Sequence, residues 1–267
     1  MVEVKNKRIV ICADDFGMNA AVDEGILELA RLGRLNATSC LVDGSTFSGN
    51  AARLRASGLQ LGLHLNFTES LGQPGLYLPV SRLILRTWTG RMDVSRCRDQ
   101  IAHQLDRFEA VIGRPPDFVD GHQHIHQFPQ IRGLLLEELK SRFAGSLPWL
   151  RYTGAGSMSG SGLRLRIKAW IIQVLGAHAF AKAARRQSFA TNRAFLGVYD
   201  FSGGEPAYSG LLRNWLQQAR DGDLIMCHPA CQVVARDALG RQRQAEFDVL
   251  RSDAAGTWLK EYGVVLA

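Results

Sequence analysis

The chain has 267 residues, enough for one large α/β domain with a substantial core. Hydrophobic residues make up 46% and charged residues 21%, which is ordinary for a globular enzyme, and no stretch reaches the roughly 18 unbroken apolar residues of a membrane span. The net charge of +7 would suit a nucleic acid, an anionic membrane or an acidic substrate. Because no helix-turn-helix, zinc-finger spacing or RNA-binding signature is present, we expect no nucleic-acid partner.

The cysteines and the first residues of the sequence indicate the cellular compartment. Residues 1–7 are polar and run directly into a strand-like segment, which is not typical of a signal peptide. The five cysteines are scattered and odd in number, which favours reduced thiols over a disulfide framework. We therefore expect a cytoplasmic protein.

Apolar runs of strand character alternate with helical patterns along the chain. This alternation predicts parallel strands with helices packed outside them. At this length we expect a single domain over residues 1–267, folded as a distorted (β/α) barrel, with a doubly wound open sheet as the alternative. The expected strands are 8–13, 38–42, 59–67, 118–122, 149–152, 195–200, 223–228 and 264–266, and the expected helices are 19–33 (capped by Asn19 and Gly33), 95–113, 129–143, 163–187, 208–220 and 245–262.

Polar residues stand at the ends of several of these strands, where the active groups of barrels collect. Asp14 and Asp15 end the first strand, and two buried carboxylates side by side favour a bound cation. The plain alternative is that one aspartate caps the following helix. His64 and Asn66 end the third strand on one face, although a lone histidine there is more often an ordinary core residue.

The segment VDGHQHIHQF is the richest in such groups. Asp120, His122, His124 and His126 share one parity, so an extended chain places them on one side. Crowded neutral imidazoles are typical of metal or catalytic sites, and the apolar flanks argue against an exposed histidine tract. His228 stands alone at the end of the run 223–227.

These residue types fit together as a hydrolytic site. One carboxylate and two imidazoles leave coordination positions open on a metal, as catalytic metal sites require. A further carboxylate and a further histidine are then available as general base and general acid. The set suits hydrolysis of an amide or an ester.

The segments ADDFGMN, GLHLNFT, VDGHQHIHQFPQI and MCHPA, in this order, resemble the YdjC-like carbohydrate deacetylases, which include chitooligosaccharide deacetylases and deacetylases associated with hopanoid biosynthesis. The resemblance covers residues 8 to about 230. It implies a polysaccharide-deacetylase-like barrel that holds one divalent metal ion, Mg²⁺ or Zn²⁺, and removes the acetyl group from an N-acetylated sugar, either an oligosaccharide or a lipid-linked amino sugar.

The resemblance also implies roles for single residues. Asp14 matches the catalytic base and His228 the general acid, while Asn66 stands inside the GLHLNFT match. Two positions depart from the family pattern, because Gly121 stands where serine is frequent and HPA replaces HPG after His228. The implied metal ligands are Asp15, His64 and His122, with His124 and His126 lining the substrate cleft and Asp120 orienting a ligand histidine.

The segment 163–187 is apolar in its middle and basic at both ends. The plain interpretation is a helix that covers the barrel. The alternative is a helix that lies on an anionic membrane, with a lipid-linked substrate and a protein peripheral to the inner membrane face. The sequence leaves open whether the chain forms a homodimer.

Three other functions compete with the deacetylase interpretation. A phosphoesterase on a similar barrel would hold two metals with more carboxylates than Asp14, Asp15 and Asp120. A metal-dependent sugar isomerase remains open. A non-catalytic sugar-binding protein with the same fold would be expected to have lost the base or a ligand, and every such position is filled.

Overall fold

The computed structural model describes residues 6–160, 162–235 and 237–266. Its central strand is β1 (Lys7–Phe16), whose apolar residues are buried as the continuous run predicts. β1 pairs in parallel with β2 (Ala37–Cys40), β7 (Leu224–Cys227) and β8 (Val264–Leu266). The strand that carries both candidate aspartates therefore lies in the middle of the sheet.

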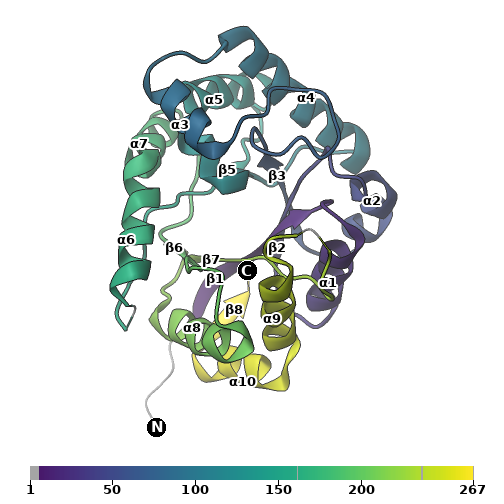
Figure 1. Ribbon diagram of the computed structural model, residues 1–267, viewed down its shortest axis with the longest axis vertical. Coiled ribbons are helices and arrows are strands. Elements are labelled where there is room, and N and C mark those ends of the chain that lie inside the picture. The colour runs from purple at the N-terminus through teal and green to yellow at the C-terminus, as the bar shows by residue number, and fades with distance from the viewer. Residues whose placement is uncertain (1–5, 161, 236, 267) are drawn as a thin grey trace.

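The remaining strands extend the sheet on both sides. β3 (Gln60–Leu65), β4 (Phe118–Gly121) and β5 (Trp149–Leu150) follow β2, and β6 (Phe195–Leu196) follows β7, in the order β5-β4-β3-β2-β1-β7-β6. The sheet curls (Figure 1). Isolated bridges between Leu150 and Thr191 and between Ala155 and Phe195 connect its two ends. The expected distorted barrel is confirmed, because the strand order does not reverse as in a doubly wound sheet.

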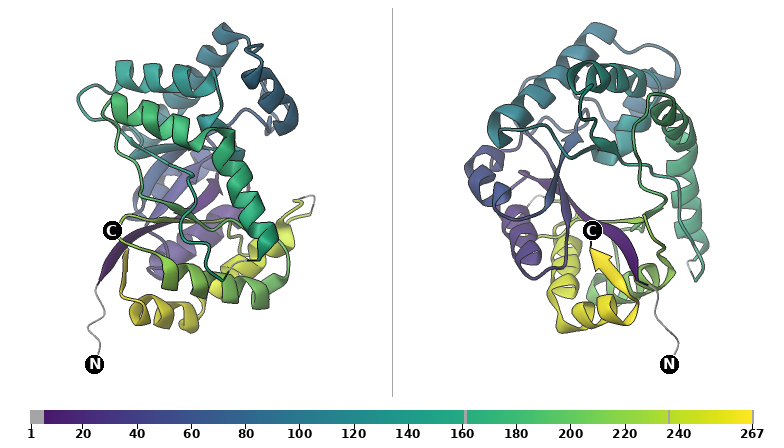
Figure 2. Two further views of the ribbon diagram at one scale, coloured as in Figure 1. Left: turned by 90° about the vertical axis from the view of Figure 1, so that its left-hand side faces the viewer. Right: turned by 180° about the vertical axis from the view of Figure 1, so that it is seen from behind.

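The helices surround this curled sheet on the outside (Figures 1 and 2). At α1 the side chain of Asn19 caps the helix by accepting a hydrogen bond from the Val22 N–H, as predicted. The helices are α1 (Ala20–Arg31), α2 (Phe47–Arg55), α3 (Val80–Trp88), α4 (Val94–Ile112), α5 (Ile131–Arg142), α6 (Leu163–Ile172), α7 (His178–Arg186), α8 (Gly204–Gln218), α9 (Gly240–Arg251) and α10 (Asp253–Glu261), with a short 3₁₀ turn η1 (His122–Gln127) and a π turn η2 (Gln173–Ala177).

Two long helical patterns are interrupted in the structure. The segment 163–187 bends at Gly176, where φ is 136° and a Cβ would lie 2.3 Å from the Gln127 carbonyl oxygen. The segment 245–262 divides at Ser252, which ends α9 and caps α10 through its hydroxyl. Periodicity alone does not reveal either break, because the apolar pattern continues through it.

The remaining expectations concern cysteines and membrane spans. Five free thiols are present, four of them buried, in agreement with the prediction. Within the described ranges, no helix combines the length and apolarity needed to cross a membrane.

Candidate active site

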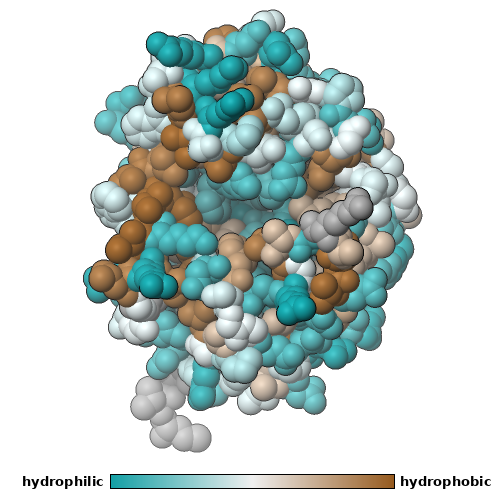
Figure 3. Space-filling view, in the orientation of Figure 1, coloured by the Kyte–Doolittle hydropathy of each residue, from teal (hydrophilic) through white to brown (hydrophobic). Residues whose placement is uncertain are grey.

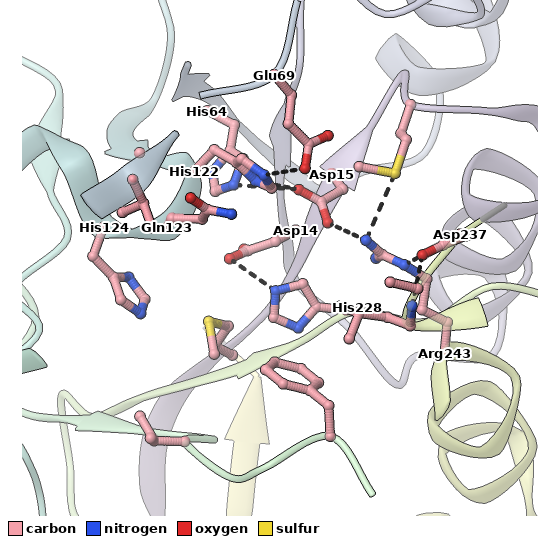
Figure 4. Close-up of a pocket in the computed structure, with 18 of the residues that line it drawn as sticks. Asp14, Asp15, His64, Glu69, His122, Gln123, His124, His228, Asp237 and Arg243 are labelled. Atoms are coloured by element: carbon pink, nitrogen blue, oxygen red, sulfur yellow. Dashed lines mark hydrogen bonds and ion pairs between the residues drawn. The ribbon is translucent and has the colours of Figure 1, made fainter. Parts of the chain in front are cut away.

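A cavity of about 730 Å³ opens at the carboxyl ends of β1, β3, β4 and β7. Figure 4 shows that Asp14, Asp15, His64, His122 and His228 all point into it. The two aspartates reach the same cavity because Asp15 has φ 73° at a register shift in β1, which turns its side chain back beside that of Asp14.

Asp15, His64 and His122 form a buried cluster on one side of the cavity. One ligand atom from each lies within 4.8 Å of the other two. Asp15 Oδ1 is 3.4 Å from His64 Nε2 and 3.1 Å from His122 Nδ1. The other oxygen, Oδ2, accepts a hydrogen bond of 2.7 Å from Arg243, so Oδ1 alone faces the two imidazoles.

The chemistry of this cluster fits a bound cation. Burial by itself would lower the pKa of His64, but Asp120 and Asp15 raise it to about 10. Burial would likewise lower the pKa of His122, and Asp15 and Glu69 raise it to about 9. The carboxylates thus favour positive charge between the rings, and neutral imidazoles with a carboxylate are ligands of Zn²⁺ and related metals. The three residues are therefore suited to hold one divalent ion.

Asp14 lies on the other side, in a fully buried pair with Arg151. The guanidinium donates from Nη1 to Oδ2 and from Nη2 to Oδ1, both at 2.6 Å. Ser39 donates to Oδ1 at 3.0 Å. Burial would raise the pKa of Asp14, but Arg151 outweighs burial and holds it below its usual range. Asp14 is therefore an oriented, ionised carboxylate.

His228 faces Asp14 across the cavity floor. Its Nε2 is 3.9 Å from Asp14 Oδ2, and its backbone N–H donates to Glu246 at 2.6 Å. Burial lowers the pKa of His228 to about 4, so the ring is neutral near neutral pH. Ala230, two residues later, does not have a positive φ, so the HPA segment needs no glycine for its turn.

Asp120 and Asn66 lie behind the cluster and not at the cavity surface. Asp120 Oδ1 is 2.7 Å from His64 Nδ1, which leaves His64 Nε2 directed at Asp15. Asn66 accepts hydrogen bonds from the backbone of Thr68 and Glu69 and so folds the loop after β3. That loop brings Glu69 Oε1 to 3.2 Å from His122 Nε2.

The expectation of an extended chain through the three histidines is wrong. β4 ends at Gly121, and η1 follows, with left-handed φ values of 54° at Gln123 and 61° at His124. His124 lines the cavity, but His126 turns inward, where its Nε2 lies 2.9 Å from the Arg151 carbonyl. His126 therefore does not line the cleft. A Cβ at Gly121 would lie 2.9 Å from His126 N, which explains glycine at this position.

Four residues of the site have no place in the sequence prediction. Two of them could have been found from the sequence: Glu69 follows the end of a predicted strand, and Arg151 is an isolated charged residue inside a predicted strand. Arg243 and Glu246 come from α9, which begins at Gly240; Arg243 therefore precedes the predicted helix 245–262, and nothing in the sequence distinguishes either residue from a surface residue. Both are buried, and Arg243 connects Asp15 to Asp237.

Fold and site together define the class: an α/β barrel protein with a carboxylate–imidazole cluster, a paired aspartate and a neutral histidine around one cavity. The sequence matches the family described as YdjC-like protein over residues 8–261, and the chain belongs to that family.

Individual known proteins are similar to this chain in sequence or in fold. A chitooligosaccharide deacetylase of Salmonella schwarzengrund (strain CVM19633) is 30% identical in an alignment of 269 positions that covers 96% of this chain and 95% of that protein. A candidate cellobiose-phosphate cleavage protein of Enterococcus faecalis V583 has a similar structure, with a TM-score of 0.69, 23% identity and coverage of 98% and 97%. A family 4 acetyl xylan esterase of Clostridium thermocellum, solved with a cobalt ion, has a TM-score of 0.51, 13% identity and coverage of 97% and 87%. The fold is that of the polysaccharide deacetylases, as expected.

Proposed function

We propose that the chain is a metal-dependent hydrolase that removes the acetyl group from an N-acetylated sugar. The observation that carries this proposal is the placement of Asp15, His64 and His122 within 4.8 Å of one another, beside Asp14 and His228, in one cavity. The relative named chitooligosaccharide deacetylase supports the substrate class.

Each group has a part in amide hydrolysis. Asp15, His64 and His122 would hold one divalent ion, Mg²⁺ or Zn²⁺. A metal bound there supplies Lewis acidity to the attacking water and to the acetyl carbonyl. Asp14 Oδ2 accepts the proton of that water, while Arg151 and Ser39 keep the carboxylate in place.

His228 delivers a proton to the departing amine. Its ring is neutral near neutral pH, so it must first receive a proton. The Asp14 carboxyl, 3.9 Å away, is the adjacent source once it has taken the proton of the water. His228 thus acts as a relay between the base and the leaving nitrogen, and Phe201 packs edge-on against its ring at 5.1 Å between centroids.

The cavity suits a sugar ring. Its volume of about 730 Å³ falls in the range of small-molecule sites. Tyr199 and Phe201 provide aromatic walls, and His124 has a buried Nδ1 without a hydrogen-bond partner among the described residues. Both an oligosaccharide and a lipid-linked amino sugar remain substrates to be tested.

The structure disfavours a two-metal phosphoesterase, because an arginine already occupies the position where a second metal ion would bind. Cys12, Asp14 and Asp120 also lie close together, but the Arg151 guanidinium occupies the space among them. A permanent cation already neutralises these carboxylates.

Acetate release tests the proposal. The metal-reconstituted protein is incubated with N-acetylglucosamine, chitobiose and a lipid-linked N-acetylglucosamine, with and without chelator. Asp14→Asn should bind metal and lose at least about a thousandfold in kcat. His122→Ala should lose both metal and activity, and His103→Ala, a half-exposed histidine on α4, should lose neither. No release from any substrate with metal bound, or full activity of Asp14→Asn, would overturn the proposal.

A further inference from the structure

α6 exposes an unusual row of apolar side chains. Leu163 is 72% exposed and Trp170 60%, and Ile167, Ile171 and, in the adjoining turn η2, Val174 are each between 45% and 48% exposed. Their spacing places them on one face of the helix, turned away from the barrel. Figure 3 shows hydrophobic residues along this side of the molecule, next to the hollow of the cavity. This face has no partner within the described residues.

α3 presents a second apolar face beside the same cavity. Leu85 is 63% exposed and Trp88 55% exposed. Val80 of α3 and Ile172 of α6 both line the cavity, so the two helices border its opening. The exposed residues Leu85, Trp88, Leu163, Ile167, Trp170, Ile171 and Val174 are called the α6–α3 surface below.

The segments that carry this surface are rich in basic residues. Residues 139–199 contain no Asp or Glu and ten Lys or Arg, and residues 70–92 contain no Asp or Glu and three Arg. Arg164 and Arg166 are exposed on α6 itself, and Arg82 and Arg86 are exposed on α3. The surface is thus apolar and carries flanking arginines, with Asp200 beside Lys168 as an acidic neighbour of α6.

We infer that the α6–α3 surface docks on an anionic phospholipid bilayer. Exposed aliphatic residues with tryptophan and flanking arginines are the composition of interfacial helices. Phosphate headgroups complement the flanking arginines. A second copy of the chain fits poorly, because a two-fold interface brings the same patch against itself and would oppose arginine to arginine.

Docking in this way would place the mouth of the cavity at the level of the lipid headgroups. This consequence rests on the proposed function, since it gives an acetylated amino sugar carried on a lipid direct access to the site. Vesicle binding itself does not depend on catalysis, so the two can fail separately.

Co-sedimentation with vesicles tests the docking surface. The full chain is mixed with vesicles of phosphatidylcholine alone, or with equal parts of phosphatidylglycerol, in about 50 mM and about 500 mM salt. We expect binding to the anionic vesicles at low salt. Trp170→Gln with Ile171→Gln should weaken binding about tenfold or more, and Arg164→Gln with Arg166→Gln should weaken it similarly and reduce its salt dependence.

The matched controls lie away from this surface. Val265→Gln changes an exposed apolar residue on β8, and Arg31→Gln an exposed arginine at the end of α1; neither should alter binding. Acetate release from chitobiose by the two double variants of the surface should equal that of the parent chain. Absence of binding to anionic vesicles, equal binding by the Trp170 variant, or a dimer that this variant dissociates would overturn the inference, whatever the acetate assay shows.

Discussion

Arg151 and Asp14 form a two-point ion pair at 2.6 Å that is buried from solvent, although 137 residues separate them in sequence. The same guanidinium contacts Asp120 at 2.6 Å, and Asp120 in turn contacts His64. One arginine directly after β5 therefore fixes both the candidate base and the residue behind a candidate ligand. The geometry of the two halves of the site depends on it.

Arg151→Met should lower the free energy of unfolding by about 3–5 kcal/mol, because two buried carboxylates lose their cation. Urea denaturation measures this change. The exposed Arg8–Asp221 pair provides the comparison, and Arg8→Gln should cost less than about 1 kcal/mol. If Arg151→Met does not fold, Arg151→Lys keeps the charge but loses the two-point geometry, and a stability equal to the parent chain would contradict the argument.

Gly176→Ala should destabilise the protein by about 2 kcal/mol or more, since alanine meets both a strained φ and the Gln127 carbonyl. Gly133→Ala on α5 is the matched control. A Cβ at Gly133 would have no other atom within 4 Å, and the residue lies in a regular helix, so this change should stabilise by about 0.5–1 kcal/mol. Thermal unfolding of both variants measures these changes. Similar melting temperatures for the Gly176 and Gly133 variants would contradict the packing argument.

Glu246 should make stability depend on pH. Burial raises its pKa to about 7 from 4.5, in spite of hydrogen bonds from His228 N–H and the Tyr199 hydroxyl. The folded state therefore holds this proton more tightly than the unfolded state. The resulting stabilisation is complete below about pH 4.5 and is lost as pH rises towards about 7, by about 3 kcal/mol.

Glu246→Gln should remove this dependence of the free energy of unfolding on pH. The amide keeps an acceptor for His228 N–H and offers a donor to Tyr199, so the contacts persist without the charge. Free energies of unfolding between pH 5 and pH 8 should fall less in this variant than in the parent. Glu137→Gln, an exposed carboxylate on α5, should leave the slope unchanged. An identical slope in the Glu246 variant would disprove the assignment.

Metal should stabilise the fold through the Asp15 cluster. A ligand at a hundred times its Kd adds about 2.7 kcal/mol to the free energy of unfolding. Adding Zn²⁺ or Mg²⁺ to the chelated protein should raise its melting temperature, and Asp15→Asn should suppress most of that rise. His103→Ala should retain it. A rise of equal size in Asp15→Asn would show that the metal binds elsewhere.

Much of the barrel follows from local signals in the sequence. The run before Asp14 predicts a buried central strand because it is apolar on both faces, and Asn19 predicts the start of α1 through its cap. The proximity of Asp15, His64 and His122 also follows, because parallel strands bring their carboxyl ends together. These features depend on residues close in sequence or on one rule of topology.

The missed features depend on contacts between distant residues. The turn after Gly121 is set by His126 packing under Arg151 and Phe180, and not by the alternation of residues 120–126. Arg243 enters the site from a helix whose sequence resembles a solvated one, and only its tertiary position directs it to Asp15. The bend at Gly176 likewise reflects close approach to Gln127.

The pairing of β1 has a consequence for the order of folding. Two of its neighbours, β7 and β8, belong to the last part of the sequence; β7 runs along one edge of β1, and β8 pairs with the opposite edge, on the side of β2, with Lys7 opposite Val264. Contacts that close such long loops form late, because the chain loses the entropy of loop closure before the strand pairing stabilises it. During synthesis the strand that carries Asp14 and Asp15 is made well before β7, and its β7 edge stays unpaired until that strand follows. The candidate site would then be complete only after β7 and α9 have been synthesised, because His228 directly follows β7 and Arg243 lies on α9.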